Sequence, residues 1–275
     1  MRRVVRQPAV YRPRHLSPQS AWYTPEAYFD LYPLNEIALA LYPETDRDDL
    51  PEWQVSAGES RGLGYGGIPK LSEPDKTEVK HAMQGYLASI SFADTMVGKL
   101  IKALDESGRA DSTTIVLWSD HGWHLGEKDT WGKFTLWERS SHVPFLILAP
   151  GVTRAGTRSD EAVSLQSVYA TLADLAGLDL PAHVDGASLR LLLENPEATS
   201  EDVAFTFHQL GAYAVQDDQW RYIRYEDGAE ELYNHAVDPN EWTNLAGDPE
   251  HTERLEAMRK KAPPADEQAA PQILD

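Results

Sequence analysis

The sequence predicts an α/β fold in which strands are flanked by helices, followed by a small antiparallel sheet with a closing helix near the C-terminus. Residues 78–104 carry apolar side chains at spacings of three and four, the period of a long amphipathic helix. Two short apolar and β-branched runs, 114–118 and 143–148, indicate buried central strands. Beyond about residue 195, short alternating segments are separated by turn residues. Together these patterns predict an α/β sandwich with an added β subdomain.

The first elements follow from local composition. Residues 1–76 are rich in Pro, Gly and aromatic residues without a sustained period, so we expect loops and short turns over a larger core. The helix predicted over 78–104 is followed by Gly108, which is expected to cap it. A second helix is predicted over 165–176, closed by Gly177.

The C-terminal part is predicted as a β subdomain. Its expected strands cover 203–207, 212–215 and 220–225, and its expected helix covers about 250–261. We therefore predict a main domain over 1–195, with an irregular start over 1–20, a β subdomain over 196–262 and a tail over 263–275.

Composition narrows the class of protein. Hydrophobic residues make up 41% of the 275 residues, enough for a sizeable core. The net charge of −19 argues against a nucleic-acid partner, whose backbone attracts Lys and Arg clusters. No apolar run of about 18 residues predicts a membrane span, and no apolar segment after Met1 resembles a signal peptide. The absence of Cys rules out disulfides and leaves the compartment open.

The most informative stretch, residues 119–127, follows the first apolar run directly. There the chain places Asp120 and His121 at the expected end of a strand, and Gly122 allows a tight turn. A carboxylate oxygen and an imidazole nitrogen suit a divalent cation, and Lys133 could hold an anionic group against it. The alternative is structural: Asp120 caps the next turn and His121 is a satisfied polar residue.

The wider pattern favours the metal site. Its ordered pieces are Ser-Asp-His-Gly-Trp at 119–123, Leu-Gly-Glu at 125–127, Trp-Gly-Lys at 131–133 and His-Val-Pro at 142–144. This stretch resembles the second metal-binding segment of the sulfatases, especially the iduronate-2-sulfatase-like branch of the alkaline phosphatase superfamily. Further similarity is carried by 28–33, 86–94 and 231–246. The resemblance covers roughly residues 20–260 and matches the second half of a typical sulfatase, so it implies an alkaline-phosphatase-like sandwich with a partial central sheet.

The resemblance also implies roles for individual residues. Asp120 and His121 match metal ligands, with Ca²⁺ as the family's cation, and Lys133 matches a catalytic lysine that contacts the sulfate. His124 is a second candidate for substrate binding, with a solvent-facing loop position as the alternative. Glu127 is expected to orient the loop or a ligand by hydrogen bonding.

For other aromatic and imidazole side chains, a role in substrate binding has to be weighed against a structural role. Trp123 and Trp131 could stack on a sugar ring, although core packing is the commoner role for such residues. His142 matches a branch-specific variant of a position that is often Arg in the resembled family, and it is expected to be structural or to support a residue that binds the ligand.

Several family features are missing or altered in this chain. The family's formylglycine nucleophile comes from a Cys-x-Pro-Ser-Arg motif, yet the chain has no Cys and Ser17–Ser20 has the wrong order. The first carboxylate pair is also missing, because Asp48-Asp49 lies in a polar stretch, 44–51, that predicts a solvated loop. His15, in Arg-Pro-Arg-His, departs from the family's Arg-Pro-His step and remains a candidate catalytic residue.

The resemblance implies a sulfuric-ester hydrolase truncated to its second half, acting on a sulfated carbohydrate or an aryl sulfate. Alone it is expected to be inactive, because neither the nucleophile nor the first carboxylate pair is present. One alternative is a split sulfatase whose missing N-terminal half is on another chain. Another is a non-catalytic remnant or carbohydrate-binding relic. A phosphatase or phosphodiesterase of the superfamily would need a Thr or Ser nucleophile and extra His ligands. Family members are often exported or lysosomal, but this sequence does not indicate a compartment.

Overall fold

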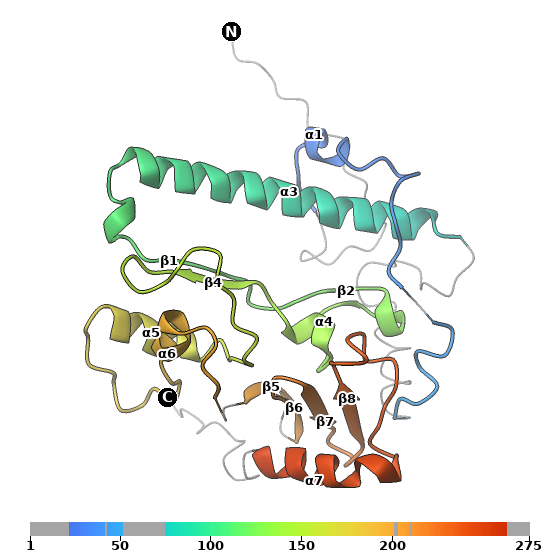
Figure 1. The fold of residues 1–275 in the computed structure, drawn as a ribbon. Helices are drawn as coiled ribbons and strands as arrows, with labels where there is room; N and C mark the ends of the chain where they lie inside the picture. The colour runs from blue at the N-terminus through green and yellow to red at the C-terminus, as the bar shows by residue number, and fades with distance from the viewer. Residues whose placement is uncertain (1–21, 42, 52–74, 201–202, 210, 263–275) are drawn as a thin grey trace, which may run out of the picture. The chain divides into compact units, whose positions relative to one another are not determined.

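The computed structural model describes residues 22–41, 43–51, 75–200, 203–209 and 211–262 (Figure 1). His15 and the predicted tail over 263–275 lie outside the described residues. The chain divides into two compact units, each made of segments that are not consecutive in the sequence. The first unit is Met1–Asp48, Glu52–Asp111 and Trp123–Gly132, and the second is Asp49–Pro51, Ser112–Gly122 and Lys133–Asp275.

The first unit is built on the long helix that the apolar period predicts. This helix, α3, covers Thr77–Glu106, and Gly108 follows it with φ of 69° as the expected C-terminal cap. The short helix α1 (Glu26–Phe29) lies along α3, where the rings of Tyr28 and Phe92 pack edge to face with centroids 5.3 Å apart (Figure 1). The first turns of α3 are buried, whereas its C-terminal part carries the exposed Leu100.

The core of the first unit also fixes the loop that follows Gly122. A small hairpin pairs β2 (His124–Leu125) with β3 (Trp131–Gly132), and a 3-10 turn over Glu127–Asp129 joins the two strands. Trp131 packs in the α3 core, whose buried members are Ile37, Val79, Ala82, Met83 and Trp131. Trp131 is therefore core, and the alternative that it stacks on a sugar does not fit this burial.

The two predicted apolar runs of the second unit form strands that pair with each other. Strand β1 (Ile115–Trp118) runs antiparallel to β4 (Phe145–Leu148), with Ile115 opposite Leu148. We expected these strands to be buried, and this expectation is wrong for the described residues: Trp118 and Leu146 are 49% and 57% exposed. In the described part of the chain this sheet has two strands, and a wider sheet with helices on both faces would bury more of such apolar side chains.

Three short helices belong to this part of the chain: α4 precedes β4, and α5 and α6 follow it. Helix α4 covers Glu138–Ser141, helix α5 covers Ser167–Leu175 and helix α6 covers Arg190–Glu194. The prediction of a helix over 165–176 is confirmed by α5, and Gly177 follows with φ of 66°. These helices belong to the same unit as β1 and β4, so the α/β fold class is confirmed.

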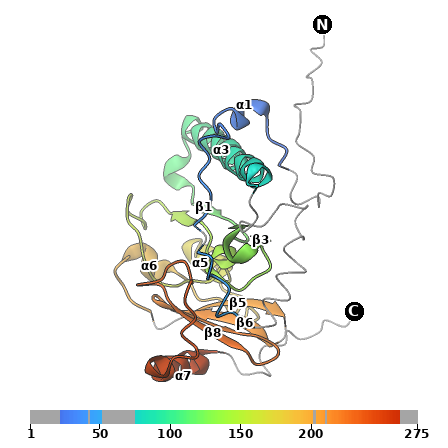
Figure 2. The ribbon, with the colours of Figure 1, turned by 90° about the vertical axis from the view of Figure 1, so that its right-hand side faces the viewer.

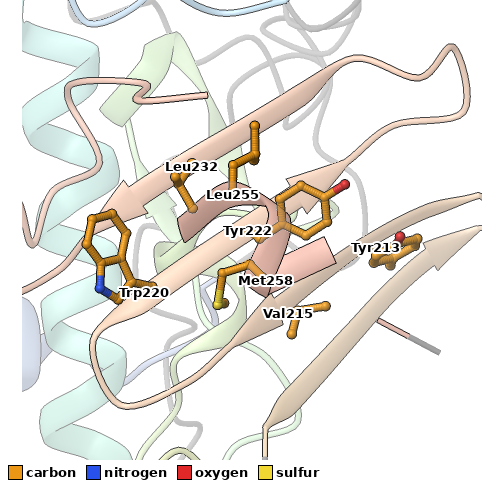
Figure 3. Packing of buried hydrophobic residues seen from close by; sticks show 7 residues of the cluster. All are labelled: Tyr213, Val215, Trp220, Tyr222, Leu232, Leu255 and Met258. Carbon is orange, nitrogen blue, oxygen red and sulfur yellow. The ribbon is translucent and has the colours of Figure 1, made fainter. Parts of the chain in front are cut away.

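The C-terminal sheet has the strand order β5-β6-β7-β8, all antiparallel. Its strands are β5 (Ala204–Gln209), β6 (Ala212–Gln216), β7 (Trp220–Arg224) and β8 (Glu230–Asn234). Helix α7 (Thr252–Lys261) follows the 3-10 turn Pro249–His251 and covers one face of this sheet (Figure 2). Leu255 and Met258 of α7 pack against Tyr213, Val215, Trp220, Tyr222 and Leu232 of the strands (Figure 3).

Strand β8 is the longest strand among the elements that sequence analysis did not predict. Its Glu230 and Glu231 have low β propensity, which hides the strand from a pattern search. In the fold, Leu232 and Tyr233 are fully buried and Glu231 is held by hydrogen bonds. The predicted division of the chain at residue 195 stays a prediction. No helix in the described ranges combines the length and the hydropathy needed to span a bilayer.

Candidate active site

Strand β1 ends at a tight turn that presents the predicted metal pair. The Ser119 backbone N–H donates to the Pro144 carbonyl oxygen at 3.3 Å, which continues the pairing with β4 by one residue. The Ser119 hydroxyl donates to the His121 carbonyl oxygen at 2.9 Å and closes the turn. Beyond the strand, the Asp120 side chain is 81% exposed. The apolar strand thus anchors a turn whose carboxylate faces solvent.

Gly122 lets this turn pack directly on the backbone of α4. Its N–H donates to the Ser140 carbonyl oxygen at 2.8 Å. A Cβ atom at Gly122 would lie 2.1 Å from the Arg139 carbonyl oxygen and 3.1 Å from that of His142. Glycine is therefore required here by close backbone approach, because no Cβ atom fits at such a distance.

Gly122→Ala is expected to lower the free energy of unfolding by about 1–3 kcal/mol, since the added methyl group must push the turn away from α4. Gly247→Ala is the matched control, because Gly247 lies in the same unit and a Cβ atom there would meet nothing within 4 Å. Urea denaturation of both variants measures the difference. Equal stability of the two variants would show that the turn moves freely.

The structure brings Asp120, His121 and Lys133 together. The His121 Nδ1 atom lies 2.8 Å from the Gly122 carbonyl oxygen, so Nδ1 carries the hydrogen and Nε2 presents a lone pair. Asp120 Oδ2 lies 3.7 Å from that Nε2 atom. Lys133 Nζ lies 2.7 Å from the same Nε2 atom and donates to it. All three side chains belong to the second unit.

This donor set fits a divalent cation in part. Two ligand atoms that each lie about 2.3–2.6 Å from Ca²⁺ can be separated by 3.7 Å, the distance between Asp120 Oδ2 and His121 Nε2. The hydrogen bond from Nδ1 to a backbone carbonyl leaves Nε2 free of hydrogen, as metal ligation requires. In the structure this lone pair accepts a hydrogen bond from Lys133, so Lys133 Nζ must move aside before Nε2 can ligate a cation. Two ligands do not complete the roughly six to eight that Ca²⁺ takes.

His124 and Glu127 belong to the hairpin of the first unit, whereas Asp120, His121 and Lys133 belong to the second unit. His124 is 1% exposed, so it is not a solvent-facing loop residue, and its Nδ1 lies 4.0 Å from Glu127 Oε2. Glu127 Oε2 accepts the Leu125 N–H at 2.6 Å and so orders its own loop. The Trp123 ring stacks on Tyr86 with centroids 6.5 Å apart. The substrate role of His124 stays a prediction.

The same hairpin is held by a buried ion pair that sequence analysis missed. Lys128 Nζ lies 3.0 Å from Asp46 Oδ1, and Asp46 Oδ2 accepts the Lys128 N–H at 2.9 Å. Both side chains are buried, and Lys128 has a positive φ of 52° that these contacts support. The solvated-loop expectation for 44–51 is thus wrong at Asp46, although Asp48 and Asp49 are exposed. A partner 82 residues away leaves no local signal in the sequence.

A second acidic and imidazole group lies beside α4. Ligand atoms of Glu138, His235 and Glu241 come within 4.8 Å of one another, a spacing that a metal ion could also produce. However, the guanidinium of Arg221 contacts both carboxylates, with Nε 2.8 Å from Glu241 Oε1 and Nη2 against Glu138. Because Arg221 already supplies the compensating charge, we assign the group as a structural ion-pair network.

Titration properties agree with this network. Burial raises the pKa of Glu138, but the hydrogen bond with His142 and the charge of Arg221 outweigh it and lower that pKa to about 2. The same hydrogen bond, 2.6 Å between His142 Nδ1 and Glu138 Oε1, raises the pKa of His142. His142 therefore has a structural partner in the fold.

Comparison with known proteins places this chain in a family. The family model described as Sulfatase matches residues 28–178, which is more than half of the 275 residues. The chain belongs to the sulfatase family. A second model, described as N-sulphoglucosamine sulphohydrolase, C-terminal, matches residues 126–268 of this sulfatase chain.

Individual relatives agree with the family and show its extent. A sulfatase of Formosa agariphila is 36% identical over 250 residues, covering 90% of this chain and 48% of the relative. The phosphonate monoester hydrolase of Silicibacter pomeroyi has a TM-score of 0.74 at 25% identity and covers 86% of this chain and 51% of that one. A protein solved with its substrate D-glucosamine-2-N,6-O-disulfate has a TM-score of 0.57 at 27% identity, with coverages of 66% and 40%. This sulfatase chain spans about half the length of the relatives it matches.

Proposed function

We propose that this sulfatase chain contributes part of a Ca²⁺-dependent site for hydrolysis of sulfuric esters. Asp120 and His121 are the metal ligands in this proposal, and Lys133 is the group that contacts the sulfate. The observation that carries it is the convergence of the three side chains, with Asp120 Oδ2 3.7 Å and Lys133 Nζ 2.7 Å from His121 Nε2. These residues come from two ends of a 14-residue stretch, so the fold rather than simple adjacency brings Lys133 to the pair.

Each side chain has a definite chemical task. A bound Ca²⁺ would act as a Lewis acid on a sulfate oxygen and orient the ester. The Asp120 carboxylate and the His121 lone pair hold such an ion, and the Nδ1 hydrogen bond keeps the imidazole in the required tautomer. The Lys133 ammonium offsets the charge of the sulfate and of the oxygen on which charge grows in the transition state. His124 and His15 are further candidates for substrate contact and proton transfer.

We further propose that the formylglycine nucleophile and the first carboxylate pair come from residues outside this sequence, on a preceding part of the same protein or on another chain. The sequence contains no Cys, and it covers 48% of the Formosa relative. The exposed apolar side chains of the β1–β4 sheet support this proposal, because such a surface normally has a cover. In this proposal the 275 residues alone are inactive.

The proposed substrates are sulfated carbohydrates or aryl sulfates, in line with the iduronate-2-sulfatase-like pattern of residues 119–133. The relative solved with a glucosamine disulfate supports a carbohydrate. A phosphonate monoester is the second candidate, because the hydrolase of Silicibacter pomeroyi matches with a TM-score of 0.74. If the assembled halves are inactive, a non-catalytic, carbohydrate-binding remnant becomes the favoured function.

The test is reconstitution with the N-terminal half of a related sulfatase. We expect hydrolysis of a chromogenic aryl sulfate in the mixture with added Ca²⁺, and none by either half alone. Parallel assays with an aryl phosphonate monoester separate the two substrate classes. Activity of the 275 residues alone would contradict the proposed origin of the nucleophile. An inactive mixture whose halves associate would favour the remnant.

A further inference from the structure

The loop after β8 reaches helix α4 through one buried side chain, Glu241. This residue is 2% exposed and has a positive φ of 58°, which is uncommon for a residue other than glycine. Its Oε2 atom accepts the N–H of Glu138, the first residue of α4, at 2.9 Å. Its Oε1 atom lies 3.0 Å from His235 Nε2. The carboxylate thus binds the N-terminal end of α4, where a negative charge is favourable.

Arg221 of β7 makes further contacts with the start of α4 and with Glu241. Its Nε atom lies 2.8 Å from Glu241 Oε1, and its Nη1 donates to the Leu136 carbonyl oxygen at 3.1 Å, just before α4. Its Nη2 contacts the Glu138 carboxylate. The C-terminal sheet and the loop after β8 therefore hold both the backbone and a side chain at the start of α4.

Helix α4 in turn supports the proposed metal pair. It has four residues, and a helix of this length does not persist without tertiary contacts. Its last turn supplies the Ser140 carbonyl oxygen that accepts the Gly122 N–H at 2.8 Å. The Arg139 carbonyl oxygen lies so close to Gly122 that no Cβ atom fits between them. The backbone of Asp120, His121 and Gly122 thus rests directly on α4.

We propose that Glu241 is a positioning residue for the Asp120–His121 pair, acting through α4 and Gly122. This inference rests on the proposed function of that pair, and it assigns the loop after β8 a role in the site rather than in stability alone. Glu241 touches neither metal nor substrate in this scheme. When its carboxylate is lost, the start of α4 loses the acceptor for the Glu138 N–H, and Arg221 loses one of its partners.

Two variants and a matched control test the inference on the full 275-residue chain. Glu241→Gln keeps an oxygen acceptor but loses the charge, and Glu241→Ala loses both. Glu230→Gln is the control, because Glu230 lies on β8 of the same sheet and binds Arg259 and Tyr222 instead of α4. The measurement compares the hydrogen-exchange rate of the Gly122 amide with the rates of the β7 amides, which report unfolding of the sheet.

We expect the Gly122 amide to exchange at least about tenfold faster in Glu241→Ala, with a smaller increase in Glu241→Gln, while the β7 amides and the control stay near wild type. Terbium(III) luminescence of each variant mixed with the N-terminal half of a related sulfatase, as a probe of the Ca²⁺ site, is expected to show about 10–100-fold weaker binding in Glu241→Ala, the range for loss of groups that orient ligands. Equal acceleration of Gly122 and β7 amides, or the same loss in Glu230→Gln, would overturn the inference.

Asp120→Ala separates failure of the inference from failure of the proposed function. If terbium binding is unchanged in Asp120→Ala, the metal site itself is wrong. If Asp120→Ala removes binding and Glu241→Ala leaves both terbium binding and Gly122 exchange unchanged, the proposed function stands and the positioning role of Glu241 is overturned.

Discussion

Asp120→Ala is expected to lower the Ca²⁺-dependent sulfatase activity of the reconstituted enzyme by about 10³-fold. The Asp120 carboxylate is the anionic ligand in the proposed pair, at 3.7 Å from His121 Nε2. Lewis-acid stabilisation by a bound metal contributes several kcal/mol, and each 1.4 kcal/mol corresponds to about a tenfold change in rate. Initial rates with a chromogenic aryl sulfate, measured over a range of Ca²⁺ concentrations, give the loss.

Asp160→Ala is the matched control for this experiment. Asp160 is an exposed carboxylate in the same unit, paired with Arg158, and it lies outside the proposed site. Its removal changes net charge by the same amount, so it should leave the rate within about twofold. Full activity of Asp120→Ala at every Ca²⁺ concentration would exclude this carboxylate as a metal ligand.

Arg221→Met is expected to lower the free energy of unfolding by about 3–5 kcal/mol, the usual cost of breaking a buried ion pair on one side. The guanidinium is buried between Glu138 and Glu241 and also donates to the Leu136 carbonyl oxygen. Met preserves much of the apolar stem, so the loss reports mainly on the two carboxylates left without this cation. Denaturation in urea, followed by tryptophan fluorescence, measures the change.

Arg224→Met controls for removal of an arginine from the same strand. Arg224 is exposed on β7, and a surface substitution of this kind usually changes stability by no more than about 0.5 kcal/mol. A loss below about 1 kcal/mol in Arg221→Met would mean that water or a rearranged side chain replaces the guanidinium. The assignment of Glu138, His235 and Glu241 as a structural network would then be wrong.

The candidate site was predictable to the extent that its residues are close in the chain. Asp120 and His121 follow an apolar strand, and Lys133 follows a Trp-Gly step, so residue type and order are enough to select them. Their partners were not predictable. Asp46 binds Lys128 from 82 positions away, and Glu241 binds the Glu138 backbone from 103 positions away. A search for local patterns does not detect side chains that meet only after folding.

For the fold, the type of element was predictable from the sequence, whereas burial was not. The period of 78–104 predicted α3, and the alternation after residue 203 predicted β5, β6 and β7, because helix and strand periods follow from backbone geometry. The apolar composition of 114–118 predicted a strand but not its exposure, since Trp118 remains 49% exposed. Burial depends on which other segment covers a face.

The sequence by itself determined the family pattern, the helices and strands with a clear apolar period, and the identity of Asp120, His121 and Lys133 as candidates, because each rests on short-range order along the chain. Only the tertiary structure decided that Lys133 reaches His121, that Gly122 must lack a side chain against α4, and that Glu241 holds the start of that helix. These facts are distances between atoms of separate segments. They arise when packing brings those segments together, and they cannot be predicted from residue order alone.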